Sequence, residues 1–412
     1  MTAQRWRSAD RVSQLIGRAI SALRFCGSSR GHVRGPVREP VQEPVPDRAR
    51  ERIPAQARPR SAVAPAGAGL VALLTALFAA VSLQAGCALL GAGGAGGQEA
   101  PSGGRAPGAG SPSESASKDR SGKPTLLVSC LSDEVFLRAV RSLGGEGCYI
   151  IYQQEGESGG RLDEAKLRRS IASKIPQGHT GWAMLDFEGH WLAFLNRAPE
   201  DPAFAQGERA MLRLIEIAKE VRPTTKWTVY AVPNLPFFVK DDAGRIVGWD
   251  KGSAASKAAE MAKGRRPQRV VDACDWVSPS VYHPYSFRGN PEWRRALPEY
   301  VRASAELAKS MAGDKPVLPM IWHRIHDSNQ KDGLELLTAE QWTVGVIEPA
   351  LAGGADGVVW WGADESMLRS GGLGKRQREE FEAVQAAGQE AVRDYLRLLH
   401  LRKLQELRPY FE

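Results

Sequence analysis

The fold of this 412-residue chain is decided by GWAMLDFEGHW, residues 181–191, where an uncharged apolar run ends in two carboxylates. Side chains at i and i+2 of a strand point to the same face. A strand ending here would therefore project Asp186 and Glu188 together and turn Phe187 into the opposite layer. Two carboxylates held this close titrate as a pair, and one of them is pushed toward staying protonated near neutral pH. Asp-x-Glu is also typical of a solvated strand edge or a helix cap, so the motif alone does not decide its role.

Short apolar runs alternate with amphipathic segments of helical length after residue 122, which predicts a parallel α/β fold. The seven predicted strands span 125–129, 149–152, 181–186, 227–232, 276–281, 317–322 and 357–361. The predicted helices span 133–143, 163–175, 208–221, 253–263, 291–311, 339–352 and 377–407. No glycine-rich dinucleotide loop or Walker loop follows a strand, which disfavours a doubly wound nucleotide-binding sheet. We predict a distorted (β/α) TIM-like barrel of about seven parallel strands.

The basic charge of the chain is concentrated in its N-terminal part. Residues 1–120 carry 16 Lys and Arg against 8 Asp and Glu, and the 39 basic and 39 acidic residues that follow cancel. The net charge of +8 therefore does not belong to the predicted barrel. No basic stripe with interleaved aromatic residues follows residue 120, so we predict no nucleic-acid partner.

Composition predicts four regions: a disordered basic leader at 1–66, an apolar signal-like segment at 67–87, a Gly/Ser/Pro-rich tether at 88–122, and the barrel domain at 123–412. Cys87 ends the apolar segment like the lipidated cysteine of a bacterial lipobox, although Gln84 stands where that pattern has a branched apolar residue. Ordinary signal cleavage or an uncleaved span are the alternatives. We expect an exported protein, either a periplasmic or cell-surface lipoprotein held at the membrane by Cys87 or a secreted one.

Polar and aromatic residues gather at the predicted strand ends, where barrel enzymes carry their active sites. Beyond the carboxylate pair they are Tyr230, Asn234, Ser280, Tyr282, His283, Trp322, His323, His326, Trp360, Trp361, Asp364 and Glu365. Aromatic platforms beside carboxylates suit sugar rings, whose C–H faces stack on Trp and Tyr. Core aromatics at a barrel rim are the alternative interpretation for Tyr282 and Trp361.

The remaining polar candidates do not predict a cofactor. His323 and His326 have i, i+3 spacing but follow a strand and lack a third ligand nearby, so no metal site is predicted. We interpret Asp364 and Glu365 as helix-capping or rim charges. Of the five cysteines, three follow the tether, which allows at most one internal disulfide: Cys130, Cys148 and Cys274.

Four motifs, in order, resemble the hyaluronidase-type glycoside hydrolases of animals and insect venoms over most of residues 123–400. The motifs are Asp186-Phe187-Glu188 before an aromatic-rich segment, Tyr230-Ala231-Val232-Pro233, Pro279-Ser280-Val281-Tyr282, and the GADGVVWWG strand at 354–362. The resemblance implies a distorted barrel and substrate-assisted retaining hydrolysis. In that mechanism the 2-acetamido carbonyl of the sugar attacks its own anomeric carbon.

Carried over by position, the resemblance implies that Glu188 is the general acid and base and that Asp186 orients the acetamido group. It also implies substrate contacts for Tyr282, Tyr230, Trp361, Trp360 and Ser280. The predicted function is therefore that of an endo-N-acetylhexosaminidase, similar to a hyaluronidase, acting on hyaluronan or a related acetamido-sugar polymer.

The chain departs from the family in three respects. Nothing after Cys274 can form the disulfide that ties the animal enzymes' C-terminal part to the first strand region. Gly189-His190-Trp191-Leu192 stands where the family has Trp-Arg-Pro, and the predicted barrel is neutral although hyaluronan is a polyanion. Two alternatives stay open: a non-catalytic glycan-binding lipoprotein, and a barrel glycosidase for another polysaccharide with Asp186 as nucleophile.

Overall fold

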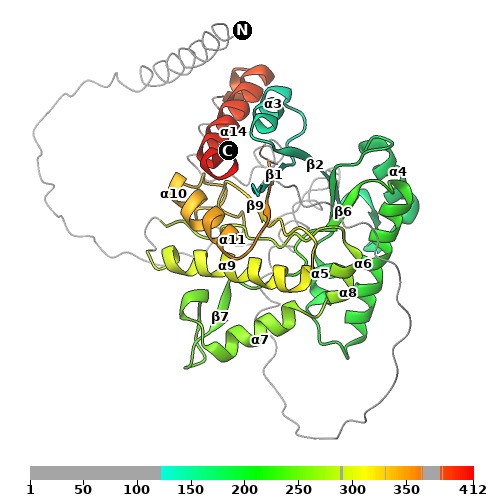
Figure 1. Ribbon diagram of the computed structural model, residues 1–412, viewed down its shortest axis with the longest axis vertical. Helices are drawn as coiled ribbons and strands as arrows, with labels where there is room; N and C mark the ends of the chain where they lie inside the picture. The colour runs from blue at the N-terminus through cyan, green and yellow to red at the C-terminus, as the bar shows by residue number, and fades with distance from the viewer. Residues whose placement is uncertain (1–121, 288–290, 330, 363, 365–380, 383) are drawn as a thin grey trace, which may run out of the picture. The chain divides into compact units, whose positions relative to one another are not determined.

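The computed structural model describes residues 122–287, 291–329, 331–362, 364, 381–382 and 384–412 (Figure 1). The leader, the signal-like segment with Cys87 and the tether up to residue 121 lie outside these residues, as does Glu365. Within the described part, no helix is both long and apolar enough to cross a membrane.

Six parallel strands form the main sheet in the order β6-β5-β2-β1-β10-β9. Their bounds are β1 Thr125–Val128, β2 Glu146–Tyr152, β5 Trp182–Asp186, β6 Lys226–Val229, β9 Met320–Ile321 and β10 Gly357–Trp360. Every residue of β5 and β10 is buried, as expected for parallel strands covered on both faces. Two short hairpins pair β3 (Glu157–Ser158) with β4 (Arg161–Leu162), and β7 (Phe238–Lys240) with β8 (Ile246–Gly248).

Residues 276–281 close this sheet into a ring. Isolated parallel bridges pair Tyr230 with Ser278, Val277 with Val317, and Ser280 with Met320. Pro279 lies inside the segment and has no backbone N–H to donate, so a continuous ladder does not form. The predicted barrel of about seven parallel strands is confirmed, with its fifth member present as bridges rather than as a regular strand.

Helices cover the outside of the ring (Figure 1). They are α3 Glu134–Ser142, α4 Glu164–Lys174, α5 His190–Leu195, α6 Pro202–Val221, α7 Ala254–Gly264, α8 Gln268–Ala273, α9 Trp293–Ala312, α10 Ala339–Trp342, α11 Glu348–Ala352 and α14 Gln389–Phe411. Helix α6 begins before the predicted 208, because Asp201 caps it by accepting from Ala203 N at 2.9 Å and Pro202 suits the first helical position. The predicted helix at 339–352 is interrupted by a π-helical turn, Thr343–Ile347, just before Pro349.

Side chains on opposite faces of the strands fill two separate hydrophobic layers. In β5, Trp182 and Met184 belong to the barrel interior, whereas Ala183 and Leu185 face the helices. Asp186 follows Trp182 and Met184 at the same two-residue spacing, so its side chain also points into the barrel interior. It lies at the C-terminal end of β5, where barrel enzymes carry their active sites.

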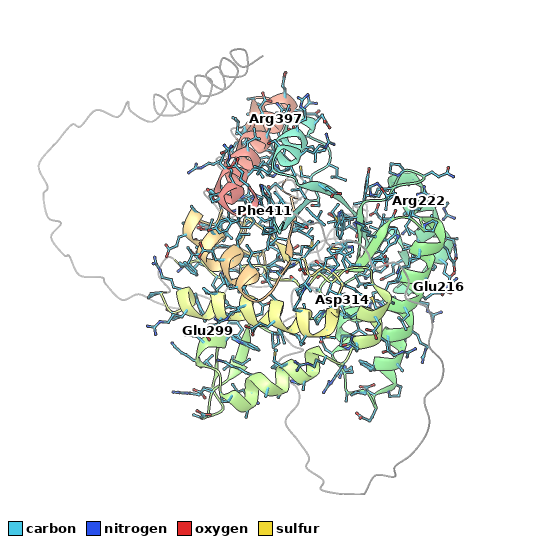
Figure 2. All side chains as sticks on the ribbon, in the orientation of Figure 1. Glu216, Arg222, Glu299, Asp314, Arg397 and Phe411 are labelled. Atoms are coloured by element: carbon cyan, nitrogen blue, oxygen red, sulfur yellow. The ribbon has the colours of Figure 1, made fainter. Side chains whose placement is uncertain are left out.

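Polar side chains join distant helices across this frame. Arg397 of α14 donates from Nε to Asp133 Oδ2 at 2.7 Å, at the N-terminus of α3, and α14 packs beside α3 (Figures 1 and 2). Arg222, which follows α6, donates from Nε to Ile175 O at 2.8 Å, at the end of α4 (Figure 2). The cysteines of the described part, Cys130, Cys148 and Cys274, are all free thiols. The described domain therefore rests on its core and these contacts rather than on a disulfide.

Candidate active site

The two predicted carboxylates lie together where β5 ends. Asp186 is buried, Glu188 is solvent-exposed, and Phe187 between them is fully buried in the outer layer. The backbone N–H of Glu188 donates to Gln153 Oε1 at 3.0 Å, which holds the turn against the end of β2. The structure thus brings the two carboxyls to one side, as their i, i+2 spacing predicts.

The carboxyls of Asp186 and Glu188 share a hydrogen bond. Burial raises the pKa of Asp186 well above its ordinary value, and the negative charge of Glu188 and the shared hydrogen bond add to the rise. Desolvation also raises the pKa of Glu188, while the hydrogen bond from Asp186 acts to lower it. Solvent reaches Glu188 but hardly reaches Asp186, so the larger rise and the shared proton belong to Asp186. The second oxygen, Asp186 Oδ1, is buried and meets no hydrogen-bond partner among the described residues.

Four aromatic side chains stand beside this pair: Tyr152, Tyr230, Tyr282 and Trp361, here called the aromatic wall. The ring of Tyr282 stacks on Trp361 with 5.7 Å between centroids and 21° between planes, and the ring of Tyr230 lies 6.0 Å from Tyr282. Trp361 Nε1 donates to the hydroxyl of Tyr152 at 3.2 Å, and Tyr152 is the register partner of Asp186. All four contact the interior cluster, so the wall lies at the carboxyl end of the barrel interior.

Ser280 holds the Tyr230 side chain of the aromatic wall in place. Its Oγ accepts a hydrogen bond from the Tyr230 hydroxyl at 2.8 Å, and its backbone oxygen accepts from the Tyr300 hydroxyl at 3.2 Å. Burial raises the pKa of Tyr230 and of Tyr282 well above the ordinary value, with the negative charges of Asp186 and Glu188 adding to the rise in both. Both hydroxyls are therefore neutral donors at physiological pH.

Trp360 does not join the wall. Neighbouring residues of a strand face opposite ways, and Trp360 packs with Val358 in the outer layer, 1% exposed. Its Nε1 donates to His323 Nδ1 at 2.9 Å. This burial corrects the predicted substrate contact of Trp360. The signal was present in the sequence, since Trp360 and Trp361 cannot both face the interior.

Three residues near the pair were missed by the sequence reasoning. Gln153 Nε2 donates to Glu157 Oε2 at 2.5 Å, and Trp191 Nε1 donates to the same oxygen at 2.9 Å. Together with the bond from Glu188 N, this chain of hydrogen bonds fixes the turn that carries the candidate acid. Trp191 is 5% exposed, so it braces the site from the core. Only the tertiary fold joins β2 to the turn after β5.

His326 and Asp327 lie in the loop after β9, where the His326 ring is next to the aromatic wall. The His326 ring lies 5.8 Å from Tyr282, and its Nδ1 lies 3.3 Å from Asp327 Oδ1. The charge of Asp327 acts on Glu188 and contributes to the raised pKa of that carboxyl. The loop after β9 therefore adds a third carboxylate to the site.

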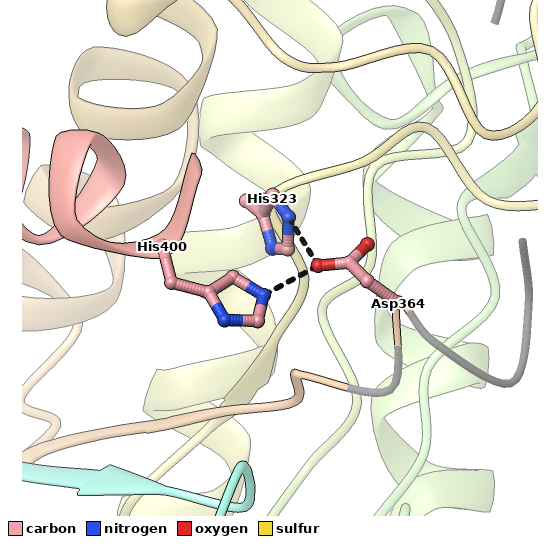
Figure 3. Close-up of side chains that lie close together, drawn as sticks. All are labelled: His323, Asp364 and His400. Atoms are coloured by element: carbon pink, nitrogen blue, oxygen red, sulfur yellow. Dashed lines mark hydrogen bonds and ion pairs between the residues drawn. The ribbon is translucent and has the colours of Figure 1, made fainter. Parts of the chain in front are cut away.

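His323, Asp364 and His400 form a buried cluster on the outer side of β10 (Figure 3). His323 Nε2 lies 2.9 Å from Asp364 Oδ2, His400 Nε2 lies 2.6 Å from the same oxygen, and Arg324 Nε donates to Asp364 Oδ1. The interpretation of Asp364 as a helix-capping or rim charge is wrong, because its side chain is 0% exposed and lies at the centre of this network.

The cluster has the residue types of a metal site, but its hydrogen bonds assign the protons differently. An indole N–H can only donate, so the bond from Trp360 makes His323 Nδ1 an acceptor and puts the ring proton on Nε2. A protonated Nε2 has no lone pair for a metal ion, and Arg324 holds the other carboxylate oxygen. Burial lowers the pKa of His323 to about 4, in keeping with a neutral ring. The arrangement fits an ion-pair network rather than a metal centre.

Comparisons with known proteins give a likeness in fold. No protein-family model and no curated protein matches the sequence. The structure is similar to that of bee venom hyaluronidase, with 17% sequence identity and a TM-score of 0.43 over 65% of this chain and 98% of that chain. The bee venom hyaluronidase complex with a hyaluronic acid tetramer gives 18% sequence identity and a TM-score of 0.40 over 60% of this chain and 90% of that chain. The endo-1,4-β-D-mannanase of Thermotoga petrophila gives 11% sequence identity and a TM-score of 0.30 over 55% of this chain and 82% of that chain. All three TM-scores are below 0.5, so the fold assignment rests on the strand topology and no role is taken from these proteins.

Proposed function

We propose that this chain is an endo-acting glycoside hydrolase that cleaves an acetamido-sugar polymer with the help of the substrate's own acetamido group. The observation that carries this proposal is the Asp186–Glu188 pair, which shares one proton beside an aromatic wall at the carboxyl end of the barrel. Cleavage of a glycosidic bond needs a positioned acid, and flat aromatic faces suit sugar rings.

Asp186 and Glu188 take different parts in the proposed reaction. The unpartnered Asp186 Oδ1 accepts a hydrogen bond from the acetamido N–H of the bound sugar, which favours the ionised form of Asp186 and passes the shared proton to Glu188. Glu188 protonates the glycosidic oxygen while the acetamido carbonyl oxygen attacks the anomeric carbon. Ionised Asp186 stabilises the positive charge that develops, and Glu188 then takes a proton from the attacking water.

The aromatic wall positions the sugar in this proposal. The neutral hydroxyl of Tyr282 donates to the acetamido carbonyl, and the face of Trp361 packs against the acetamido methyl group. Tyr230, held by Ser280 at 2.8 Å, contacts the sugar ring. Trp360 has no part in binding because it is buried in the outer layer.

The test is mass spectrometry of products after incubation of the chain with hyaluronan and with N-acetylglucosamine oligosaccharides, beside Glu188→Gln. We expect saturated products with a reducing N-acetylhexosamine end and a loss of about 10²- to 10⁴-fold in rate for Glu188→Gln. The acid assignment fails if Glu188→Gln keeps most of the activity. Unsaturated products would mean a lyase.

Substrates without an acetamido group separate the two hydrolytic mechanisms. Substrate assistance predicts no cleavage of such polymers, whereas Asp186 acting as a nucleophile predicts cleavage and a trapped glycosyl–Asp186 adduct. Binding of glycans without cleavage would instead support the non-catalytic lipoprotein.

Export and lipid anchoring through Cys87 are proposed from the sequence alone. Mass spectrometry of the mature N-terminus, with Cys87→Ser for comparison, tests them. A diacylated Cys87 in the membrane fraction supports the anchor, and an unmodified N-terminus after a cleaved signal would replace it with secretion.

A further inference from the structure

The candidate site contains a carboxylate that the proposed reaction does not use. Asp327 adds a third carboxylate from the loop after β9, with its side chain 49% exposed to solvent. It is tied to the aromatic wall through His326, whose ring lies 5.8 Å from Tyr282. Asp327 therefore borders the space in which the proposed substrate lies.

The charge of Asp327 is not offset by its neighbour. Desolvation lowers the pKa of His326, although solvent reaches part of the ring, so the imidazole is uncharged near neutral pH. The negative charge of Asp327 also contributes to the raised pKa of Glu188, which places the two groups within electrostatic reach.

A further acidic side chain, Glu157, lies near the pair, since Gln153 contacts both Glu157 and the backbone N–H of Glu188. The Glu157 carboxylate accepts two hydrogen bonds, both from the neutral donors of Gln153 and Trp191, and the Glu157 backbone oxygen accepts one from Lys166 Nζ at 2.9 Å. Lys174 lies 5.0 Å from the Tyr152 ring, but its Nζ contacts Glu155 at 2.8 Å. Lys174, the cation that contacts the aromatic wall at Tyr152, is therefore already paired with Glu155.

We propose that Asp327 is a specificity-determining residue that makes this site select uronate-free polymers of N-acetylated hexosamines over polyanions such as hyaluronan. The inference rests on the proposed function and narrows its substrate class. The unpartnered Asp186 Oδ1 is the independent sign of a ligand, since it calls for a hydrogen-bond donor such as an acetamido N–H. A uronate carboxylate in an adjoining sugar would meet Asp327 and Glu157 as like charges, within about one Debye length.

The test compares kcat/KM of the full chain on an N-acetylglucosamine hexasaccharide and a hyaluronan hexasaccharide. The variants are Asp327→Asn and, as a matched control, Asp314→Asn. Asp314 is an exposed aspartate that lies before β9, whereas Asp327 lies after it (Figure 2). We expect the wild type and Asp314→Asn to prefer the neutral oligosaccharide by on the order of tenfold. Asp327→Asn narrows this ratio severalfold, and 0.5 M salt narrows it in the wild type.

A binding measurement separates this inference from the proposed hydrolysis. Calorimetry with the same two oligosaccharides and the Glu188→Gln variant, with and without Asp327→Asn, gives the selectivity without any cleavage. A neutral-sugar preference that depends on Asp327, without turnover by the wild type, overturns the hydrolase and keeps the inference. A preference for hyaluronan, a ratio unchanged in Asp327→Asn, or no binding of either oligosaccharide overturns the inference.

Discussion

Asp186 and Asp364 are both buried aspartates at or beyond the ends of parallel strands, yet their surroundings are opposite. Asp186 faces another carboxyl and leaves one oxygen unpartnered, and burial raises its pKa. Burial acts in the same direction on Asp364, but Arg324 and the two histidines outweigh it and hold its pKa well below the ordinary value. The comparison teaches that burial raises the pKa of a carboxyl whose charge is uncompensated, whereas enclosing cations keep a buried carboxyl ionised.

Of the substitutions that compare the two aspartates, Asp364→Asn is expected to cause the largest loss of stability. The substitution leaves Arg324 and His400 as buried cations without a counter-charge, which costs about 3–5 kcal/mol of unfolding free energy. Urea unfolding followed by circular dichroism measures the loss. A change below about 1 kcal/mol would contradict the central place of Asp364 in the network.

His400 makes the ion-pair network sensitive to alkaline pH. Desolvation alone would lower the pKa of His400, but its interactions with Asp364 and Cys130 together raise it to about 9. The contribution of protonated His400 is therefore complete below pH 6.5 and is lost as pH rises through 9. We expect the stability difference between wild type and His400→Gln to shrink by up to about 3 kcal/mol between pH 6 and pH 10. A difference independent of pH would mean that His400 is neutral in the folded protein.

Asp186→Asn is expected to change stability near neutral pH by only about 1 kcal/mol, because Asp186 carries the shared proton there and the substitution replaces a neutral buried carboxyl with a neutral amide. The raised pKa means that the wild type loses stability as pH rises above 4 toward the folded pKa. The variant should therefore gain stability relative to the wild type between pH 5 and pH 8. Unfolding curves at both pH values test this, and a loss for Asp186→Asn that grows with pH would refute it.

The smallest effect concerns the bond that sets the His323 tautomer. Trp360→Phe removes the N–H that donates to His323 and should cost about 1 kcal/mol more than Trp342→Phe. Trp342 is the matched control because it is also fully buried, while its Nε1 has no hydrogen-bond partner among the residues that the structure describes. Equal losses in thermal unfolding would show that the indole N–H does not fix the ring.

Local sequence determined the strands, most helices and the carboxylate pair. Apolar runs such as 182–185 bury themselves wherever they lie, and i, i+2 spacing fixes the common side of Asp186 and Glu188. Strand parity in the sequence also separates Trp361, on the wall, from Trp360, in the core, although both were expected to contact substrate.

Tertiary structure alone decided which charges meet. Asp364 looked like a rim charge because its partners Arg324 and His400 lie 40 and 36 residues away in the sequence. Asp327 reaches the pair, and Gln153 reaches Glu188, only because the ring of parallel strands brings their carboxyl ends to one place. A pKa depends on burial and on charges within a few ångströms, and those neighbours are set by the closed barrel rather than by any local pattern.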